Sequence, residues 1–320
     1  MSDSFIKINT LSVSKNLADF VKNELLTGLD VNEKDFWDGF DKSINELAPI
    51  NKKLLEVRET LQSEIDLWLK KNRNGEFNHQ EYKNFLKEIG YLKDEGNDFK
   101  IDTKKLDSEI SSIAGPQLVV PIMNSRYTLN AANARWVSLY DSLYGTDLIE
   151  SEETGSQKYD PLRGQEVIRY AREFLNDHFS INEIHWKDIN GFKIKGSDLK
   201  ILKDDNEFEL VDKNKFIGYR GEPNNPTTII LENNNLKIEI IINPKAFSAV
   251  QDAAGISDII VESAISTICD NEDSVAAVDS EDKILCYRNW LGLMKGTLKS
   301  VFEKDGKTLE RKLNPDRSYI

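Results

Sequence analysis

The chain has 320 residues, and its 42 Lys and Arg against 55 Asp and Glu give a formal net charge of −13. A hydrophobic fraction of 39% is typical of a folded globular protein, and the length predicts two or three domains. The acidic balance argues against binding nucleic acid or an anionic membrane, because such binding requires basic surfaces that neutralise phosphates.

The cysteines and the apolar runs indicate a cytoplasmic protein. The two cysteines, Cys269 and Cys286, form no metal-ligand or CxxC pattern, which favours a reducing compartment. The amino terminus lacks the features of a secretory signal. The most apolar runs, 118–123 and 238–242, are far shorter than the roughly 20 residues of a membrane helix, so we expect no membrane span.

The first part of the chain is predicted to be helical. From Ser14 to about Leu92 the apolar residues recur at helical spacing, which predicts three or four helices. Ser14 is a candidate N-cap, Gly28 and Pro49 are predicted breaks, and residues 72–75 are predicted to end a long helix. We interpret this segment as a scaffold.

The pattern changes after a polar linker. Residues 117–123 form an apolar run without alternation, which predicts a strand buried on both faces. An amphipathic helix is predicted from about Leu129 to Tyr144. A strand followed by a helix is typical of a parallel α/β architecture.

An α+β insertion is predicted between about Gly145 and Pro244. It begins with a helix over 165–177 and continues with short alternating strands separated by Gly and Asn turns, at 192–194, 200–202, 208–210, 228–231 and 236–242. On its far side we expect a second buried strand over 265–269 and a helix from Asp273 to about Leu298.

The run Asp270-Asn271-Glu272-Asp273-Ser274 follows the second predicted strand. Ligand sites of parallel α/β folds lie at this carboxyl end of the strands. The three carboxylates could hold a cation, position a general base or orient a catalytic partner. Alternatively, they only cap the following helix and favour its positive end. Ser274 could bind a phosphate or adenine there, or act as a capping serine.

Three basic or aromatic residues are further candidates. Arg126 and Tyr127 follow the first predicted strand, where an arginine fork can bind a phosphate or a carboxylate. A surface salt bridge is the alternative. Arg311 forms a small basic spot with Lys312, which could equally be solvated surface charge.

Two long segments carry a resemblance to a known family: AGPQLVVPIMNSRYTLNAANARWVSLYDSLYGTD and ISDIIVESAISTICDNEDSVAAVDSEDKILCYRNWLGLMKGTL. Together with FWDGFD, FIGYRG, TTIILENNNLKIEI and RKLNPDR, they closely resemble malate synthase, in its monomeric G isoform. The resemblance implies an acyltransferase of the glyoxylate cycle that condenses glyoxylate with acetyl-CoA and water to give malate and CoA. It also implies Mg²⁺ as cofactor.

The family fold implies a domain division. It predicts an N-terminal α-helical clasp at 1–98, the first strands and helices of a (β/α)8 TIM barrel at 115–134 and 264–295, and an inserted α/β domain at 135–263 and 296–320. By the same resemblance, acetyl-CoA contacts are expected at Val119, Arg126, Tyr127, Ser274 and Arg311. Asp270 and Glu272 match acidic residues that line the active site.

Members of this family are more than twice as long, so we expect the chain to be an N-terminal part with an incomplete barrel of two strands. The main catalytic Arg and Asp and the Mg²⁺ ligands are then expected beyond residue 320, with no metal ligand in this chain. We expect it to be inactive and poorly soluble alone, and able to associate with a separate C-terminal half. The alternative is a non-catalytic remnant that acts as a binding or interaction module.

Overall fold

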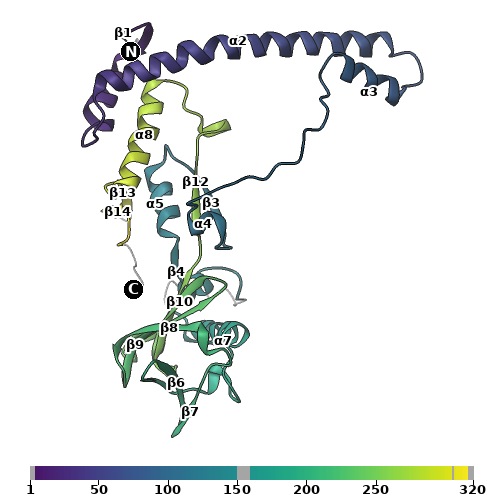
Figure 1. The fold of residues 1–320 in the computed structure, drawn as a ribbon. Coiled ribbons are helices and arrows are strands. Elements are labelled where there is room, and N and C mark those ends of the chain that lie inside the picture. The colour runs from purple at the N-terminus through teal and green to yellow at the C-terminus, as the bar shows by residue number, and fades with distance from the viewer. Residues whose placement is uncertain (1–3, 150–158, 305, 316–320) are drawn as a thin grey trace. The chain divides into compact units, whose positions relative to one another are not determined.

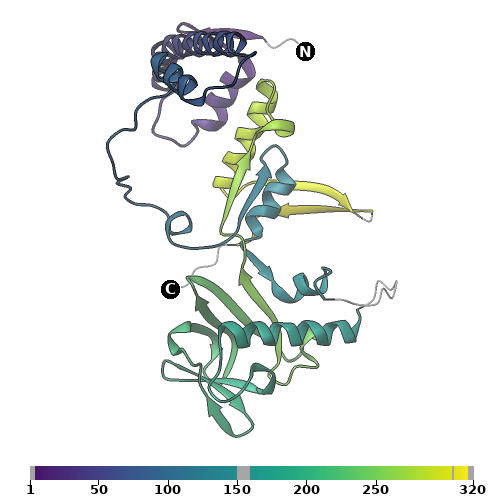
Figure 2. The same ribbon diagram turned by 90° about the vertical axis from the view of Figure 1, so that its right-hand side faces the viewer.

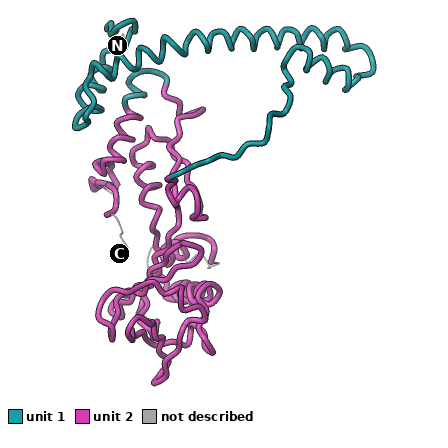
Figure 3. The backbone as a smooth tube through the Cα atoms, in the orientation of Figure 1, with its two compact units in different colours: residues 1–104, 278–284 teal, residues 105–277, 285–320 magenta. Residues whose placement is uncertain are grey.

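The computed structural model describes residues 4–149, 159–304 and 306–315. The chain divides into two compact units (Figure 3). The first comprises residues 1–104 and 278–284, and the second comprises residues 105–277 and 285–320. Helix α8 (Ser280–Met294) begins in the first unit and ends in the second.

The first unit is a short hairpin followed by helices, as Figure 1 shows. Its elements are β1 (Phe5–Ile8), β2 (Leu11–Ser14), α1 (Lys15–Phe20), the π-helical turn η1 (Val21–Leu25), α2 (Glu33–Lys71) and α3 (His79–Glu88). The helical prediction is confirmed, whereas the hairpin before it was missed.

The predicted helix ends were partly wrong. Gly28 lies in a turn with a φ of 83°, as expected of a break. Pro49 lies inside α2, a helix of 39 residues, and does not end it. The proline removes one backbone hydrogen bond, and this loss does not outweigh the helical turns before and after it. Asn72 caps α2 by donating from Nδ2 to the carbonyl of Trp68 at 2.8 Å, so the predicted end near residue 72 is confirmed.

Two apolar clusters hold the first unit together. The first cluster has six buried residues from the hairpin, the turn η1 and the helices α1, α2 and α8: Val13, Ala18, Phe20, Val21, Trp37 and Ile284. The second is aromatic, with the Trp68 ring 5.6 Å from Phe85 and 4.8 Å from Tyr82, between centroids. Trp37 and Trp68 are therefore packing residues.

A pair of parallel strands begins the second unit. β3 (Gln117–Pro121) pairs with β12 (Ser266–Asp270), with Val119 opposite Ile268 and Pro121 opposite Asp270. Helix α5 (Ser125–Asn133) packs on both strands, and the short α4 (Ser108–Ser111) precedes them. The carboxyl ends of both strands therefore lie at the same edge.

The prediction that the first strand is buried on both faces was wrong. Val120 is buried, but Val119 is 64% exposed and its partner Ile268 is 49% exposed. The reason is that a two-stranded sheet with α5 on one side leaves its other face open. The described residues form a strand pair and not a closed barrel.

The single helix predicted over 129–144 is also wrong. The chain leaves α5 after Asn133, forms β4 (Trp136–Ser138) and then enters α6 (Leu139–Tyr144). β4 pairs with β11 (Ile256–Glu262), and the Arg135 guanidinium binds Glu262 with an Nη2–Oε1 distance of 2.5 Å. These long-range interactions override the helical period.

The insertion comprises two antiparallel sheets and a helix. One sheet has the order β4-β11-β10-β9-β8 and the other β5-β6-β7. The helix of the insertion is α7 (Pro161–His178), and its 3-10 turns are η2 (Trp186–Asp188), η3 (Lys213–Lys215) and η4 (Phe247–Ala249). Its strands, besides β4 and β11, are β5 (Gly191–Lys195), β6 (Asp198–Lys203), β7 (Asn206–Phe208), β8 (Phe216–Glu222), β9 (Asn225–Asn233) and β10 (Leu236–Ile242). The prediction of an α+β insertion is confirmed, although β8 and β11 were missed.

The insertion has a continuous hydrophobic core. α7 runs along the five-stranded sheet (Figure 2) and contributes Leu175, which is fully buried. Ile201 from the smaller sheet and Ile229, Ile240 and Ile259 from the larger sheet are fully buried in the same cluster.

Candidate functional site

The turn after β3 is fixed by buried hydrogen bonds. The backbone N–H of Ile122 donates to the carbonyl of Asp270 at 3.1 Å, which continues the strand pairing. Asn289 of α8 is buried and donates from Nδ2 to the carbonyls of Ile122 at 2.9 Å and Met123 at 3.2 Å. The sequence analysis missed Asn289, because a single asparagine on an amphipathic helix carries no pattern.

The acidic run lies at the same edge but does not begin a long helix. Oδ1 of Asp270 accepts from the backbone N–H of Glu272 at 3.0 Å, and the Cys286 thiol donates to Oδ1 of Asn271 at 3.2 Å. Asp273 has a φ of 49° and starts the 3-10 turn η5 (Asp273–Val275). The run is therefore a structured turn in which Asp270 orders the backbone.

The predicted helix start at Asp273 was wrong. α8 begins at Ser280, where Oδ1 of Asp279 accepts from the backbone N–H of Asp282 at 2.9 Å. Ser274 is exposed in η5, six positions before α8, and so is not a cap of that helix. The alternative in which Asp270 caps α8 is wrong for the same reason.

The two candidate residues after β3 lie in the first turn of α5. Oδ1 of Asn124 caps this helix by accepting from the backbone N–H of Tyr127 at 3.1 Å. The Arg126 guanidinium lies 4.3 Å from the centroid of the Phe302 ring, a cation–π contact. Tyr127 is 53% exposed.

Arg311 lies against the same helix. It belongs to a hairpin of β13 (Lys299–Lys304) and β14 (Lys307–Lys312), which Figure 2 shows beside α5. Nη1 of Arg311 donates to Oδ1 of Asn130 at 2.7 Å. The hairpin was not predicted, because its charged residues conceal the alternation of a strand.

The structure thus brings two of the predicted residues, Arg126 and Arg311, to one helix. Neither has a carboxylate partner among the residues that the structure describes, so the alternative of a surface salt bridge is not observed for Arg126. No hydrogen bond or ion pair within the described ranges links them to Asp270 or Glu272. Val119 lies on the open face of the strand pair.

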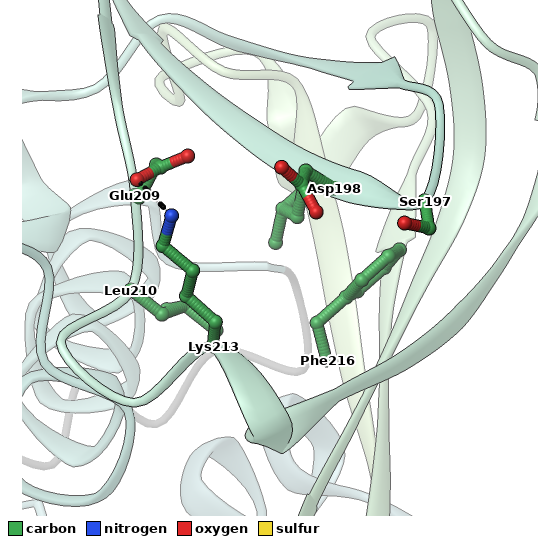
Figure 4. Close-up of a pocket in the computed structure, with 7 residues that line it drawn as sticks. Ser197, Asp198, Glu209, Leu210, Lys213 and Phe216 are labelled. Carbon is green, nitrogen blue, oxygen red and sulfur yellow. Dashed lines mark ion pairs between the residues drawn. The ribbon is translucent and has the colours of Figure 1, made fainter.

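A small pocket lies in the insertion, far along the chain from these residues. It has a volume of about 50 Å³ and is lined by Asp198, Glu209, Lys213 and Phe216 among others (Figure 4). Hydrogen bonds, first from Lys200 and then from Lys213, lower the pKa of Glu209 to about 2. Since its charges are paired, we assign it no function.

The comparisons with known proteins agree with one another. Residues 159–233 match the family model described as malate synthase G, alpha-beta insertion domain, and residues 16–78 match that of malate synthase, N-terminal domain. The chain is 44% identical to malate synthase G of Halalkalibacterium halodurans over 321 residues, which covers 99% of this chain and 44% of that protein. Malate synthase G of Corynebacterium glutamicum is 45% identical over an alignment that covers 97% of this chain and 42% of that protein. Malate synthase G of Corynebacterium efficiens is 43% identical over 98% of this chain and 42% of that protein.

The chain belongs to the malate synthase G family. It spans 42–44% of the length of these relatives. The insertion-domain match starts just before α7 and ends with β9, inside the domain whose core is described above. The other match covers α1 and α2.

Malate synthase G implies Mg²⁺, which proteins bind through carboxylate oxygens. Across the ranges 4–149, 159–304 and 306–315, no group of three or more His, Cys, Asp or Glu could hold a metal ion. The described residues therefore do not fit a magnesium site. Among the same residues, no helix is long and apolar enough to cross a membrane.

Proposed function

We propose that this chain carries the acetyl-CoA-binding part of a malate synthase, which condenses glyoxylate with acetyl-CoA and water to give malate and CoA. The observation that carries the proposal is the pair Arg126 of α5 and Arg311 of β14. Both lie at the contact between α5 and the hairpin, and neither has a carboxylate partner among the described residues. Guanidinium groups bind phosphate oxygens through directed hydrogen bonds, and CoA carries several phosphates.

The remaining candidates complete the proposed binding surface. Tyr127 and Val119 are exposed near the carboxyl edge of β3 and offer apolar contacts to the ligand. Ser274 offers an exposed hydroxyl. Glu272 is exposed while Asp270 orders its backbone, so we propose Glu272 as the acidic residue nearer the reaction and Asp270 as its positioning residue.

We further propose the domain division of the family. The clasp comprises 1–98, the parallel strand pair provides the first barrel strands in 115–134 and 264–295, and the insertion comprises 135–263 and 296–320. The open face at Val119 and Ile268 supports the barrel, because parallel sheets are usually covered on both faces. Within residues 296–320, the hairpin of β13 and β14 contacts α5.

Other family properties are proposed on the same basis. A monomeric state is proposed from the family alone. A cytoplasmic location is supported by the two free cysteines, of which Cys286 is buried. A Mg²⁺ requirement of the whole enzyme is proposed from the family alone.

CoA binding by the 320-residue chain, measured by calorimetry, tests the proposal. Arg126→Ala and Arg311→Ala should each weaken binding about tenfold, the loss expected for one charge-assisted hydrogen bond. The control is Arg169→Ala on α7, which removes an exposed arginine paired with Glu166 and Glu173. Equal affinity in all three variants would contradict the proposal.

Turnover is tested by mixing the chain with the remaining part of a relative such as the Halalkalibacterium halodurans enzyme. We expect no malate from the chain alone, malate from the mixture, and lower turnover with Glu272→Gln. Unchanged turnover would remove Glu272 from the catalytic residues. CoA binding without malate in the mixture would favour the second candidate, a non-catalytic binding module, for which the exposed apolar pair Val119 and Ile268 is the supporting observation.

A further inference from the structure

One face of α5 meets one face of the β13–β14 hairpin. Arg126, Asn130 and Asn133 are spaced four and three residues apart and therefore lie on the same side of α5. In the hairpin, Ser300 pairs with Arg311 and Phe302 pairs with Leu309, so Phe302 and Arg311 lie on one face. The two faces join segments about 180 residues apart in the chain, as the separation of 181 between Asn130 and Arg311 shows.

Asn133 anchors the end of the hairpin to the helix. Its Nδ2 donates to the carbonyl of Lys312 at 2.9 Å, and its Oδ1 accepts from the backbone N–H of Asn314 at 2.8 Å. Both bonds involve backbone groups, so they fix the chain on either side of residue 313. Arg311 is therefore adjacent to Lys312, whose backbone carbonyl is fixed by Asn133.

The groups that hold the two arginines are uncharged. The ring of Phe302 lies against the Arg126 guanidinium at 4.3 Å, and the amide oxygen of Asn130 accepts from Nη1 of Arg311 at 2.7 Å. A carboxylate in either place would neutralise the cation that it holds. An aromatic ring and an amide restrict the side chain yet leave its charge and most of its five N–H donors for a ligand.

We infer that Phe302 and Asn130 are positioning residues that preset Arg126 and Arg311 as one binding site for the phosphate groups of acetyl-CoA. This rests on the proposed function. Long arginine side chains lose rotamer freedom when they bind, and a protein that has already ordered them binds more tightly. The hairpin is then part of the ligand site, because Phe302 and Arg311 both belong to it.

The first test measures positioning without any ligand. In the free 320-residue chain, the side-chain Nε–Hε NMR signals of Arg126 and Arg311 should be dispersed. Phe302→Leu should move the Arg126 signal toward the random-coil position because the ring current is lost, and Asn130→Ala should do the same for Arg311. Averaged signals that neither substitution moves would overturn the inference.

The second test measures affinity for CoA. Asn130→Asp keeps the shape of the side chain but places a carboxylate on Arg311, and should weaken CoA about tenfold. Asn130→Ala and Phe302→Leu should each weaken it about threefold, because they leave the cations free but unordered. The control is Asn84→Asp, which makes the same charge change at an exposed helical asparagine in α3.

The two tests separate the inference from the proposed function. If the unmodified chain does not bind CoA, the ligand assignment is wrong, and the ligand-free NMR experiment still decides whether the arginines are positioned. If it binds CoA and Asn130→Asp binds as well as Asn84→Asp, the positioning role is wrong while the proposed function stands. A cooperative melt at an unchanged Tm in each variant shows that the hairpin has not simply unfolded.

Discussion

The insertion and the parallel strand pair use similar apolar residues with opposite results. In the insertion, Ile259 and Leu231 are fully buried in adjoining antiparallel hairpins, whereas in the strand pair Val119 is 64% and Ile268 is 49% exposed. An antiparallel sheet can be completed by neighbouring segments, but a parallel sheet needs distant crossovers and covering on both faces. The insertion therefore closes its own core, and the strand pair presents a surface.

A buried polar cluster further distinguishes the insertion. Arg172 of α7 forms an ion pair with Asp252, and both side chains are almost completely buried. Oδ1 of Asp252 also accepts from the backbone N–H groups of Ala254 and Ile256, each at 3.0 Å. Burial raises the pKa of the nearby Tyr140 hydroxyl. The loop before β11 is thus tied to α7 through one carboxylate.

The largest expected effect follows from removing that carboxylate. Asp252→Ala should reduce the free energy of unfolding by about 3–5 kcal/mol, because it leaves the Arg172 charge buried without its partner. Urea unfolding monitored by circular dichroism measures the loss. The control is Asp198→Ala, whose half-exposed carboxylate pairs with Lys200 at 3.7 Å and should cost at most about 1 kcal/mol. Equal losses would show that the cluster does not hold the insertion.

The same substitution in both regions tests the comparison directly. Ile259→Ala should cost about 2–5 kcal/mol, because it opens a cavity in a closed core. Ile268→Ala in β12 should cost far less, since half of that side chain is already in water. If chemical denaturation gives equal costs, the face that carries Ile268 is covered in solution and the distinction between the regions fails.

Two glycines test how closely the loop between β10 and β11 is packed. Gly255 has a φ of 70°, and an added Cβ would lie 2.7 Å from Cγ of Pro244, whereas Gly196 has a φ of 63° with nothing within 4 Å. Gly196→Ala should cost about 1–2 kcal/mol for the left-handed backbone alone. Gly255→Ala should lower Tm further, because the clash adds to the same strain. Matching Tm values for the two variants would mean that the loop with Gly255 accommodates the added methyl group without a further loss of stability.

The smallest expected effect is at the surface of the insertion. The pKa of Glu209 is lowered to about 2 by Lys200 and Lys213, so its ion pairs stabilise the fold above the ordinary pKa of 4.5. This contribution is lost as the pH falls from about 4.5 toward 2. Glu209→Gln should therefore be less stable than the unmodified chain at pH 7, with the difference shrinking below pH 4.5. A difference that persists unchanged at pH 2 would contradict the role of these ion pairs.

The sequence by itself determined the family, the helical first segment and the existence of an α+β insertion. These conclusions rest on local signals, such as helical spacing up to residue 72 and the alternation in residues 236–242, or on extended motifs that are compared position by position. It also predicts Arg126 and Arg311 as candidate ligand-binding residues, because the motifs around them are specific.

Only the tertiary structure decided how the predicted segments and candidate residues are arranged. It interrupts the predicted helix over 129–144 with β4, moves the start of α8 to Ser280 and leaves one face of β3 open. It also brings Phe302 and Asn130 to the two arginines. The physical reason is that strand pairing and contacts between residues far apart in the chain follow from packing in three dimensions, which no local period records.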